Sequence, residues 1–582
     1  MISVVHMDSG RSRTFGWVQD PSNFRSLCDV VAIFDRNSRK NRELVSVLLP
    51  RLVLPTDGRD ELITAMSTVP LKIKYAHLVG TSFKPRSTSR CNGIVQATVK
   101  GQRRDFIGDW PADNFVRWAH CLGFISYDYA DDTFAITEFG RTLTRGYTDG
   151  GELNDYEKRI LTDALLSYPP AIRILSLLNA ENAHLTKFEI GRQLGFIGEG
   201  GFGSMPQNVL VRSLVGIESA REKNEMKNNW EGASDKYARM IAVWLEKLGL
   251  VREVAKRVTT TVGGEEYADS IGQAFMITAQ GMTALNRALG RSRHPRIAKN
   301  VCFEMLATKG SDREYLRARR AFTIKFLSES RRGVTAENVV DYLASQEISA
   351  TKEAVEDDMQ GFINIGLSID NNNGSFVLRD LLNDFVIPIR TGLSRSETEN
   401  LKDELRVTMT NIPHDYLSLL DLAYDSTQNR LFEMKTLQLL TEECGYSGTH
   451  LGGGRKPDGI IYTSALAENY GVIIDTKAYS GGYNLPISQA DEMQRYVQEN
   501  QRRDIHENPN KWWENFDEDV VQFYFMFVSG HFRGQYQVQI DRIAHITNTK
   551  GAAVKIKELL VIANGIKGAI QTHSDVEEII FA

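Results

Sequence analysis

The most constraining feature of this sequence is a pattern that occurs twice in its first half. In the first copy, an amphipathic stretch ends at Leu122-Gly123 and is followed by Phe134-Ala-Ile-Thr-Glu-Phe-Gly140. In the second copy, a similar stretch ends at Leu248-Gly249 and is followed by Phe275-Met-Ile-Thr-Ala-Gln-Gly281. Apolar residues at helical spacing, a glycine that ends the helix and two β-rich segments predict a winged-helix unit in each copy.

A weaker third copy follows at residues 358–378, where Asn371-Asn-Asn-Gly374 is a strong hairpin turn signal. Three such units, in a chain of 582 residues, predict an α+β protein of several domains. Duplicated winged helices bind DNA in many proteins, but they also form protein-interaction or regulatory scaffolds. The repeat alone leaves both classes open.

The start of the second repeated helix carries polar residues suited to a nucleic-acid contact. Ser234 and Asp235 are placed to cap the helix, and Lys236 and Arg239 share one face. Residues 227–231, Lys-Asn-Asn-Trp-Glu, add amide and carboxylate groups able to read adenine and cytosine edges. A solvated helix face is the alternative. The DNA-binding candidates in both copies are Arg86, Trp110, Asn228, Trp230, Glu231, Lys236 and Arg239.

The charge is unevenly distributed. The whole chain has 69 Lys and Arg against 74 Asp and Glu, a balance that alone argues against a nucleic-acid binder. Residues 392–582, however, contain 18 basic and 27 acidic residues (net −9), which leaves 51 against 47 (net +4) for residues 1–391. The stretch from Arg291 to Arg320 is basic, which suits a phosphate contact or an exposed helix surface.

The cysteines and the apolar runs indicate where the protein works. No C-x-x-C pair is present, which favours free thiols in a reducing compartment over a zinc site or a redox pair. The N-terminus lacks the apolar core of a signal peptide, and no apolar run reaches the roughly 18 residues of a membrane span. We therefore expect a cytoplasmic protein that does not enter a membrane.

The last third carries a constellation of charged residues typical of a metal site. Asp458 follows Pro457, and an apolar run, Val472-Ile-Ile, leads directly into Asp475-Thr-Lys477. The apolar run predicts a buried central strand. Residues two apart on a strand point to the same face, so Asp475 and Lys477 are expected to share one site.

This spacing supports metal-assisted chemistry. Asp458 and Asp475 could hold Mg²⁺, with the backbone carbonyl of Thr476 and the carboxylate of Glu433 as further contacts. The metal would polarise a phosphate and lower the pKa of a bound water, and Lys477 would position or help deprotonate that water. The alternative is a plain Asp475–Lys477 salt bridge. That alternative gives no role to the glycine-rich, basic segment before Asp458 (residues 452–456).

Long segments of the chain resemble the FokI family of type IIS restriction endonucleases. The segments that carry the resemblance are residues 13–19, 167–175, 228–240, 450–459, 472–486 and 489–497. The resemblance implies three winged-helix recognition subdomains (1–150, 151–292 and 293–388), a linker (389–404), and a PD-(D/E)xK nuclease domain (405–582) of the α/β class with a central mixed sheet.

The resemblance also implies an activity. Such enzymes are Mg²⁺-dependent, bind an asymmetric duplex DNA site, of the GGATG type in this family, and cut both strands at a fixed distance to one side. Asp458, Asp475 and Lys477 match the catalytic residues, and the DNA-binding candidates other than Trp230 fall at positions that the family uses for recognition. Asp20 stands where we expect Asn; its carboxylate cannot donate a hydrogen bond to a base or phosphate.

Cutting two strands with one site per chain requires a moving site or a second copy. Asp491 and Arg495, four apart, share a face of the helix expected over residues 488–500, and an ordinary intrahelical pair is one reading. In the FokI family this helix is the dimer contact, as a two-fold interface requires. A bacterial host with a protective DNA methyltransferase is also implied.

Two other functions stay open at this point. One is a winged-helix DNA-binding regulator with a non-catalytic association domain. The other is a structure-selective repair nuclease.

Overall fold

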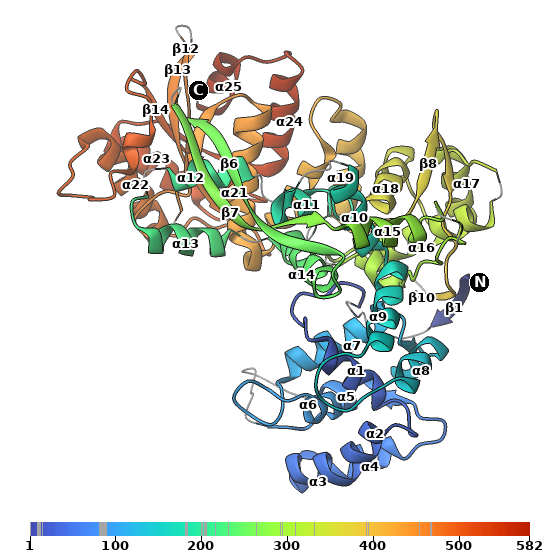
Figure 1. Ribbon diagram of the computed structural model, residues 1–582. Helices are drawn as coiled ribbons and strands as arrows, with labels where there is room; N and C mark the ends of the chain where they lie inside the picture. Colours follow the sequence, from blue (N-terminus) through green and yellow to red (C-terminus); the bar gives the residue numbers. More distant parts are fainter. Residues whose placement is uncertain are drawn as a thin grey trace. The chain divides into compact units, whose positions relative to one another are not determined.

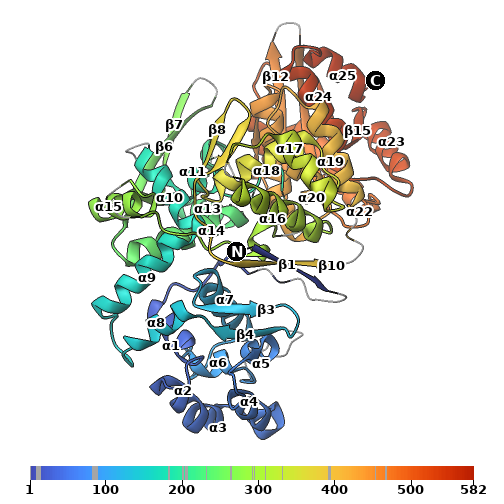
Figure 2. The same ribbon diagram turned by 90° about the vertical axis from the view of Figure 1, so that its right-hand side faces the viewer.

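The fold is described by a computed structural model (Figures 1 and 2). The residues described are 2–7, 13, 15–80, 90–180, 184–199, 202, 207–215, 217–230, 232–262, 265–291, 293, 295–308, 310–330, 332–390, 393, 395–452, 454–465 and 468–581. They form two compact units. The first comprises residues 1–190, 236–254 and 273–395, and the second comprises residues 191–235, 255–272 and 396–582.

The repeated pattern folds each time into a helix, a glycine and a hairpin, as predicted. The first copy consists of α7 (Asp109–Cys121), β3 (Ile125–Asp128) and β4 (Thr133–Ile136). The second consists of α14 (Ala233–Lys247), β6 (Val251–Val262) and β7 (Glu265–Ile277). The third consists of α18 (Lys352–Asn364), β8 (Ile369–Asn372) and β9 (Ser375–Leu378). In the first two copies a short strand, β2 (Ile73–Lys74) or β5 (Leu185–Thr186), extends the hairpin to three strands.

One glycine ends the helix in every copy because the backbone there is left-handed. Gly123 has φ of 79°, Gly249 of 74° and Gly366 of 103°. Side chains rarely tolerate this conformation, so glycine is strongly preferred at the turn from helix to strand.

A threonine after each of the first two hairpins locks the repeat together. The Thr137 hydroxyl donates to the Gly123 carbonyl oxygen (2.7 Å) and accepts from the Gly140 amide (2.9 Å). Thr278 makes the same two contacts, at 2.7 and 3.0 Å. A Cβ atom at Gly140 would lie 2.1 Å from the Phe124 carbonyl oxygen, so only glycine fits there. The repeated residues are therefore explained by backbone contacts.

The two repeated helices meet in the core of the first unit. Trp118 and Trp244 are both fully buried, and their rings stack at a centroid distance of 4.8 Å. Such a pair contributes about 0.5–1.5 kcal/mol beyond the area that it buries. The amphipathic pattern around both tryptophans thus predicted the buried face correctly.

Three arginines at the end of the basic stretch are interior. In α16 (Arg313–Glu329), Arg317, Arg319 and Arg320 are all at most 2% exposed. Arg319 donates two hydrogen bonds to the Asp358 carboxylate (2.7 and 3.0 Å) and Arg320 donates one (2.8 Å). For these three arginines the prediction of a surface or phosphate contact is wrong, because their side chains are buried.

The N-terminal strand pairs with a strand nearly four hundred residues away. β1 (Ile2–Met7) runs parallel to β10 (Phe385–Arg390), as both views show (Figures 1 and 2). Strands near the two ends of the first unit are therefore hydrogen-bonded to each other. The boundary predicted at residues 388/389 falls inside β10.

The second unit contains a five-stranded mixed sheet. Its order is β11-β12-β13-β14-β15, antiparallel as far as β13 and parallel from β13 onward. The predicted mixed character of the sheet is therefore confirmed. The strands are β11 (Ser447–His450), β12 (Gly459–Ala465), β13 (Glu468–Lys477), β14 (Phe523–Ser529) and β15 (Gly551–Lys555). The helices α22 (Ile487–Arg502) and α23 (Tyr536–Thr547) cover one face, where Met493 and Ile543 share a core with Ile473 and Phe525.

Two short helices from the middle of the chain also belong to this unit. They are α12 (Gln207–Leu214) and α13 (Ala220–Asn229). Asn208 on α12 donates to the Glu442 carboxylate at 3.2 Å, which links this segment to the C-terminal part of the chain.

All five cysteines carry free thiols, as expected, and every one except the partly exposed Cys302 is buried. Among the described residues, no helix combines the length and apolar character needed to cross a membrane.

Candidate active site

Asp458 is held against the end of the central strand. It directly precedes β12, and the pairing of Gly459 with Ile474 places it beside the end of β13. One oxygen, Oδ2, accepts hydrogen bonds from the Thr476 amide (2.7 Å) and the Thr476 hydroxyl (3.1 Å). These bonds fix the carboxylate on the strand that carries the other candidate residues.

Asp475 and Lys477 lie on one face of β13, as the two-residue spacing predicts. The Lys477 Nζ atom is 2.8 Å from the Asp475 carboxylate. Asp475 is 6% exposed, and the apolar residues before it are buried, which confirms the predicted central strand. The salt bridge offered as an alternative therefore exists, but it forms part of a larger group of charges around Asp458.

A third carboxylate comes from the neighbouring helix α21 (Asn429–Gln438). The Glu433 Oε2 atom is 3.0 Å from Nε2 of His450, the last residue of β11. Burial favours the neutral acid, yet the hydrogen bond to His450 and the charges of Arg430 and Lys477 hold the pKa of Glu433 below its usual value. The Glu433 carboxylate is therefore ionised and adds a negative charge near Asp458.

The charges in the site act strongly on one another. Burial, together with the negative charges of Asp475 and Glu433, raises the pKa of Asp458 well above its ordinary value. Burial lowers the pKa of Lys477, but the charges of Asp475 and Asp458 outweigh it and raise that pKa overall. Carboxylate oxygens that crowd together in this way fit a hard divalent cation, which would offset their mutual repulsion.

Comparisons with known proteins cover nearly the whole chain. The family models that match are FokI recognition domain subdomain 1 (residues 13–146), FokI recognition domain subdomain 2 (157–293), the FokI D3 domain (306–374) and the FokI cleavage domain (395–582). The type II restriction enzyme FokI of Planomicrobium okeanokoites is 45% identical over 570 residues, 97% of each chain. The chain belongs to the FokI family.

Further relatives agree with this assignment. The type II restriction enzyme StsI of Streptococcus sanguinis is 34% identical over 99% of this chain and 96% of its own. The solved structure of restriction endonuclease FokI matches with a TM-score of 0.90 and 44% identity, over 97% of this chain and 98% of that one. The structure of FokI bound to DNA matches with a TM-score of 0.91 at the same identity, over 98% of each chain. As a member of the FokI family, the chain is a restriction endonuclease with recognition and cleavage domains.

The DNA-binding candidates lie mostly at helix ends. Lys236 and Arg239 are partly exposed in the first turns of α14, and Trp110 is half-buried in the first turn of α7. Burial raises the pKa of Asp20, and the charge of nearby Arg239 opposes that rise. Asn228 is exposed near the end of α13. The candidates Arg86 and Glu231 lie outside the described residues.

Two details near α14 differ from the sequence prediction. The helix begins at Ala233, so Ser234 lies in its first turn, and it is Asp235 that accepts a hydrogen bond from the Gly232 amide (3.0 Å). Trp230 is fully buried, and its ring meets His450 edge-on at 5.5 Å. This burial favours a packing role for Trp230 over a contact with DNA.

The two residues expected at a dimer contact, Asp491 and Arg495, form ion pairs with other residues and not with each other. On α22, the Asp491 carboxylate pairs with Arg542 (2.5 Å), and Arg495 lies near Glu492 (3.4 Å) and Glu499 (3.5 Å). The side chains of Asp491 and Arg495 are 56% and 41% exposed. Both are therefore accessible from outside the second unit.

Two residues of the site had no role in the sequence prediction. His450 orients Glu433, and Glu492 contributes a negative charge that raises the pKa of Lys477. Both lie within the segments that carry the family resemblance, which is the signal that could have identified them.

Proposed function

We propose that this restriction endonuclease is a type IIS enzyme that binds an asymmetric duplex DNA site of the GGATG type. It hydrolyses both strands at a fixed distance to one side and depends on Mg²⁺. The observation that carries the proposal is the convergence of Asp458, Asp475 and Lys477 at one end of the mixed sheet, within the cleavage domain.

The finer architecture belongs to the same proposal. The helix–glycine–hairpin pattern supports winged-helix subdomains at residues 1–150, 151–292 and 293–388. The mixed sheet with its three charged residues supports a PD-(D/E)xK nuclease at 405–582, after a linker at 389–404. Trp110, Asn228, Lys236 and Arg239 are the proposed DNA contacts, with Arg86 and Glu231. Asp20 could contact DNA only as a hydrogen-bond acceptor. A DNA methyltransferase would protect the host without touching this enzyme.

The charged residues divide the chemistry between them. Asp458 and Asp475 would hold Mg²⁺, with the Thr476 carbonyl and Glu433 as additional contacts. When bound, the ion supplies a Lewis acid that stabilises the charge of the phosphate transition state. Lys477 is kept protonated by its neighbours, so it positions the attacking water as a donor and offsets charge on the phosphate. His450 orients the Glu433 carboxylate.

Digestion of intact plasmid DNA tests this function. We expect discrete fragments with Mg²⁺ and none after addition of EDTA. A DNA-binding regulator would bind the plasmid without cutting it, and a structure-selective nuclease would give no discrete fragments from intact duplex. Either of those outcomes would refute the proposal.

Metal binding should depend on pH through Asp458. Its raised pKa means that a proton competes with the cation, so we expect Mg²⁺ affinity to fall as the pH drops through that pKa, by up to about tenfold per pH unit. Glu433→Gln removes one of the charges that raise this pKa and should move the loss of affinity to lower pH. The measurement is a Mg²⁺ titration by calorimetry at several pH values, without DNA. The exposed residue Glu507 provides the control Glu507→Gln, and affinity that is independent of pH would contradict the assignment.

Cleavage should depend on two copies meeting through α22. We expect the rate on a one-site DNA to rise faster than linearly with enzyme concentration, and Asp491→Ala to lower it about tenfold or more at limiting enzyme. Because the Asp491–Arg542 pair is exposed, its loss should cost less than about 1 kcal/mol of stability. Asp504→Ala, at another exposed carboxylate, is the control. A rate linear in enzyme and unchanged in Asp491→Ala would contradict this contact.

A further inference from the structure

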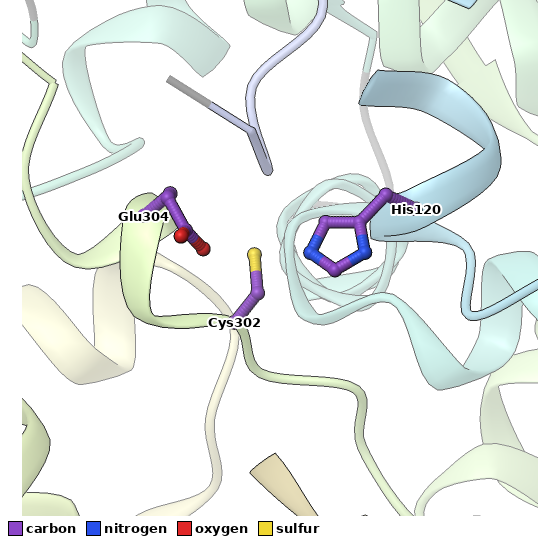
Figure 3. A group of neighbouring side chains, drawn as sticks. All are labelled: His120, Cys302 and Glu304. Atoms are coloured by element: carbon purple, nitrogen blue, oxygen red, sulfur yellow. The ribbon is translucent and has the colours of Figure 1, made fainter. Parts of the chain in front are cut away.

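Three potential metal ligands converge in the first unit. His120 lies near the end of α7, Cys302 directly precedes the short helix η3 (Phe303–Leu306), and Glu304 lies within it. Their ligand atoms all lie within 4.8 Å of one another. Figure 3 shows the Cys302 sulfur between the imidazole and the carboxylate. The proposed nuclease mechanism uses none of these residues.

The imidazole of His120 has the orientation of a metal ligand. Its Nδ1 atom is 3.1 Å from the Ile125 carbonyl oxygen, which can only accept, so Nδ1 carries the proton and Nε2 presents a lone pair. Nε2 is buried and has no hydrogen-bond partner among the described residues. Metal-binding histidines commonly donate their other N–H to a backbone carbonyl in this way.

Glu304 provides a second, independent sign of a cation site. The residue is 2% exposed, and within the described part of the chain its Oε2 atom is buried with no hydrogen-bond partner. The neighbouring Arg317 donates to the backbone carbonyl oxygens of Glu304 (3.1 Å) and Ala307 (3.0 Å). A buried oxygen without a partner requires an explanation, and a bound ion is one of the few available.

We propose that His120, Cys302 and Glu304 bind one Zn²⁺ ion. Thiolate, imidazole and carboxylate are the ligand types that zinc prefers, whereas Mg²⁺ does not favour sulfur. Ligands of a tetrahedral zinc lie about 3.5 Å apart, so the three side chains need to close by only about 1 Å. One thiolate and one carboxylate would together offset both charges of a divalent cation.

The surroundings leave room for a fourth ligand. His120 and Cys302 line a cavity of about 480 Å³ that also includes Tyr129 and Asn300. The cavity provides an entry path for the ion and space for a water to complete its coordination. Bound zinc would link the end of α7 to η3, two segments far apart in the sequence, and so stabilise the first unit.

Cobalt substitution of the full-length protein tests the site. Protein freed of metal first receives excess Mg²⁺, which occupies the cleavage site, and Co²⁺ is then added. We expect about one Co²⁺ per chain with a thiolate-to-cobalt charge-transfer band in the near ultraviolet, and Zn²⁺ should displace it. Cys302→Ser should abolish the band, Glu304→Gln should weaken binding about tenfold or more, and Cys91→Ser, at another buried thiol, should change neither.

Thermal unfolding of the unmodified protein gives a test that needs no variant. Zinc in excess over its Kd should raise the Tm by about 3 °C or more, and Cys302→Ser should lose that rise. No charge-transfer band in the wild type, a band that survives in Cys302→Ser, or a Tm insensitive to zinc would each overturn the proposal. DNA cleavage is not part of the readout, so failure here is distinct from failure of the nuclease proposal.

Discussion

Asp475→Ala and Lys477→Ala should each lower the rate of DNA cleavage by at least about 10³-fold and leave binding of target DNA nearly unchanged. Asp475 is a proposed metal ligand, and Lys477 is the positive group fixed 2.8 Å from it. The recognition domains do not contain either residue, so affinity for DNA should survive. Single-turnover cleavage with Mg²⁺ and a gel-shift assay in EDTA measure the two properties separately.

A matched substitution controls for charge. Lys550→Ala removes an exposed lysine of the same domain and should cleave at the wild-type rate. If Asp475→Ala or Lys477→Ala bound DNA and cut it at the wild-type rate, the assigned roles would be wrong. If the variants lost DNA binding together with cleavage, the proposal that separate domains recognise and cleave the DNA would be wrong instead.

Asp358→Ala should destabilise the first unit by about 3–5 kcal/mol. Asp358 accepts hydrogen bonds from Arg319 and Arg320, and all three side chains are at most 2% exposed. The substitution leaves two buried guanidinium groups without their shared carboxylate, which costs far more than an exposed pair. Thermal unfolding followed by circular dichroism, with target DNA binding as a second readout, measures the loss.

The control is an exposed pair in the same region. Asp370 and Arg379 lie 2.6 Å apart with side chains about half exposed (49% and 50%), so Asp370→Ala should cost less than about 1 kcal/mol. The charges of Arg319 and Arg320 overcome burial and hold the pKa of Asp358 below its ordinary value. The stabilisation is therefore present at neutral pH and is lost as the pH falls toward that lowered value. Equal losses in the two variants would contradict this account of the buried network.

The sequence predicted the repeated units well because their determinants are local. A left-handed glycine and a threonine that bonds back to it lie within one short stretch of chain, so the pattern in residues 118–140 returns in residues 244–281. The same holds for Asp475 and Lys477, whose shared face follows from strand geometry alone.

Features that depend on distant partners could not be predicted in this way. From the sequence alone, Arg319 and Arg320 indicate a basic surface. In the structure both bind Asp358, which another helix contributes. The pairing of β1 with β10 and the packing of Trp230 against His450 likewise join segments far apart in the chain. No local pattern encodes such contacts.

Mapping of the cut positions on both strands of a DNA of known sequence tests the central claim most directly. With Mg²⁺, the account predicts one cut per strand, each at a constant distance on the same side of every copy of an asymmetric site, and no cuts in EDTA. Cuts inside the recognition site, at variable distances, or only at branched or damaged DNA would contradict it.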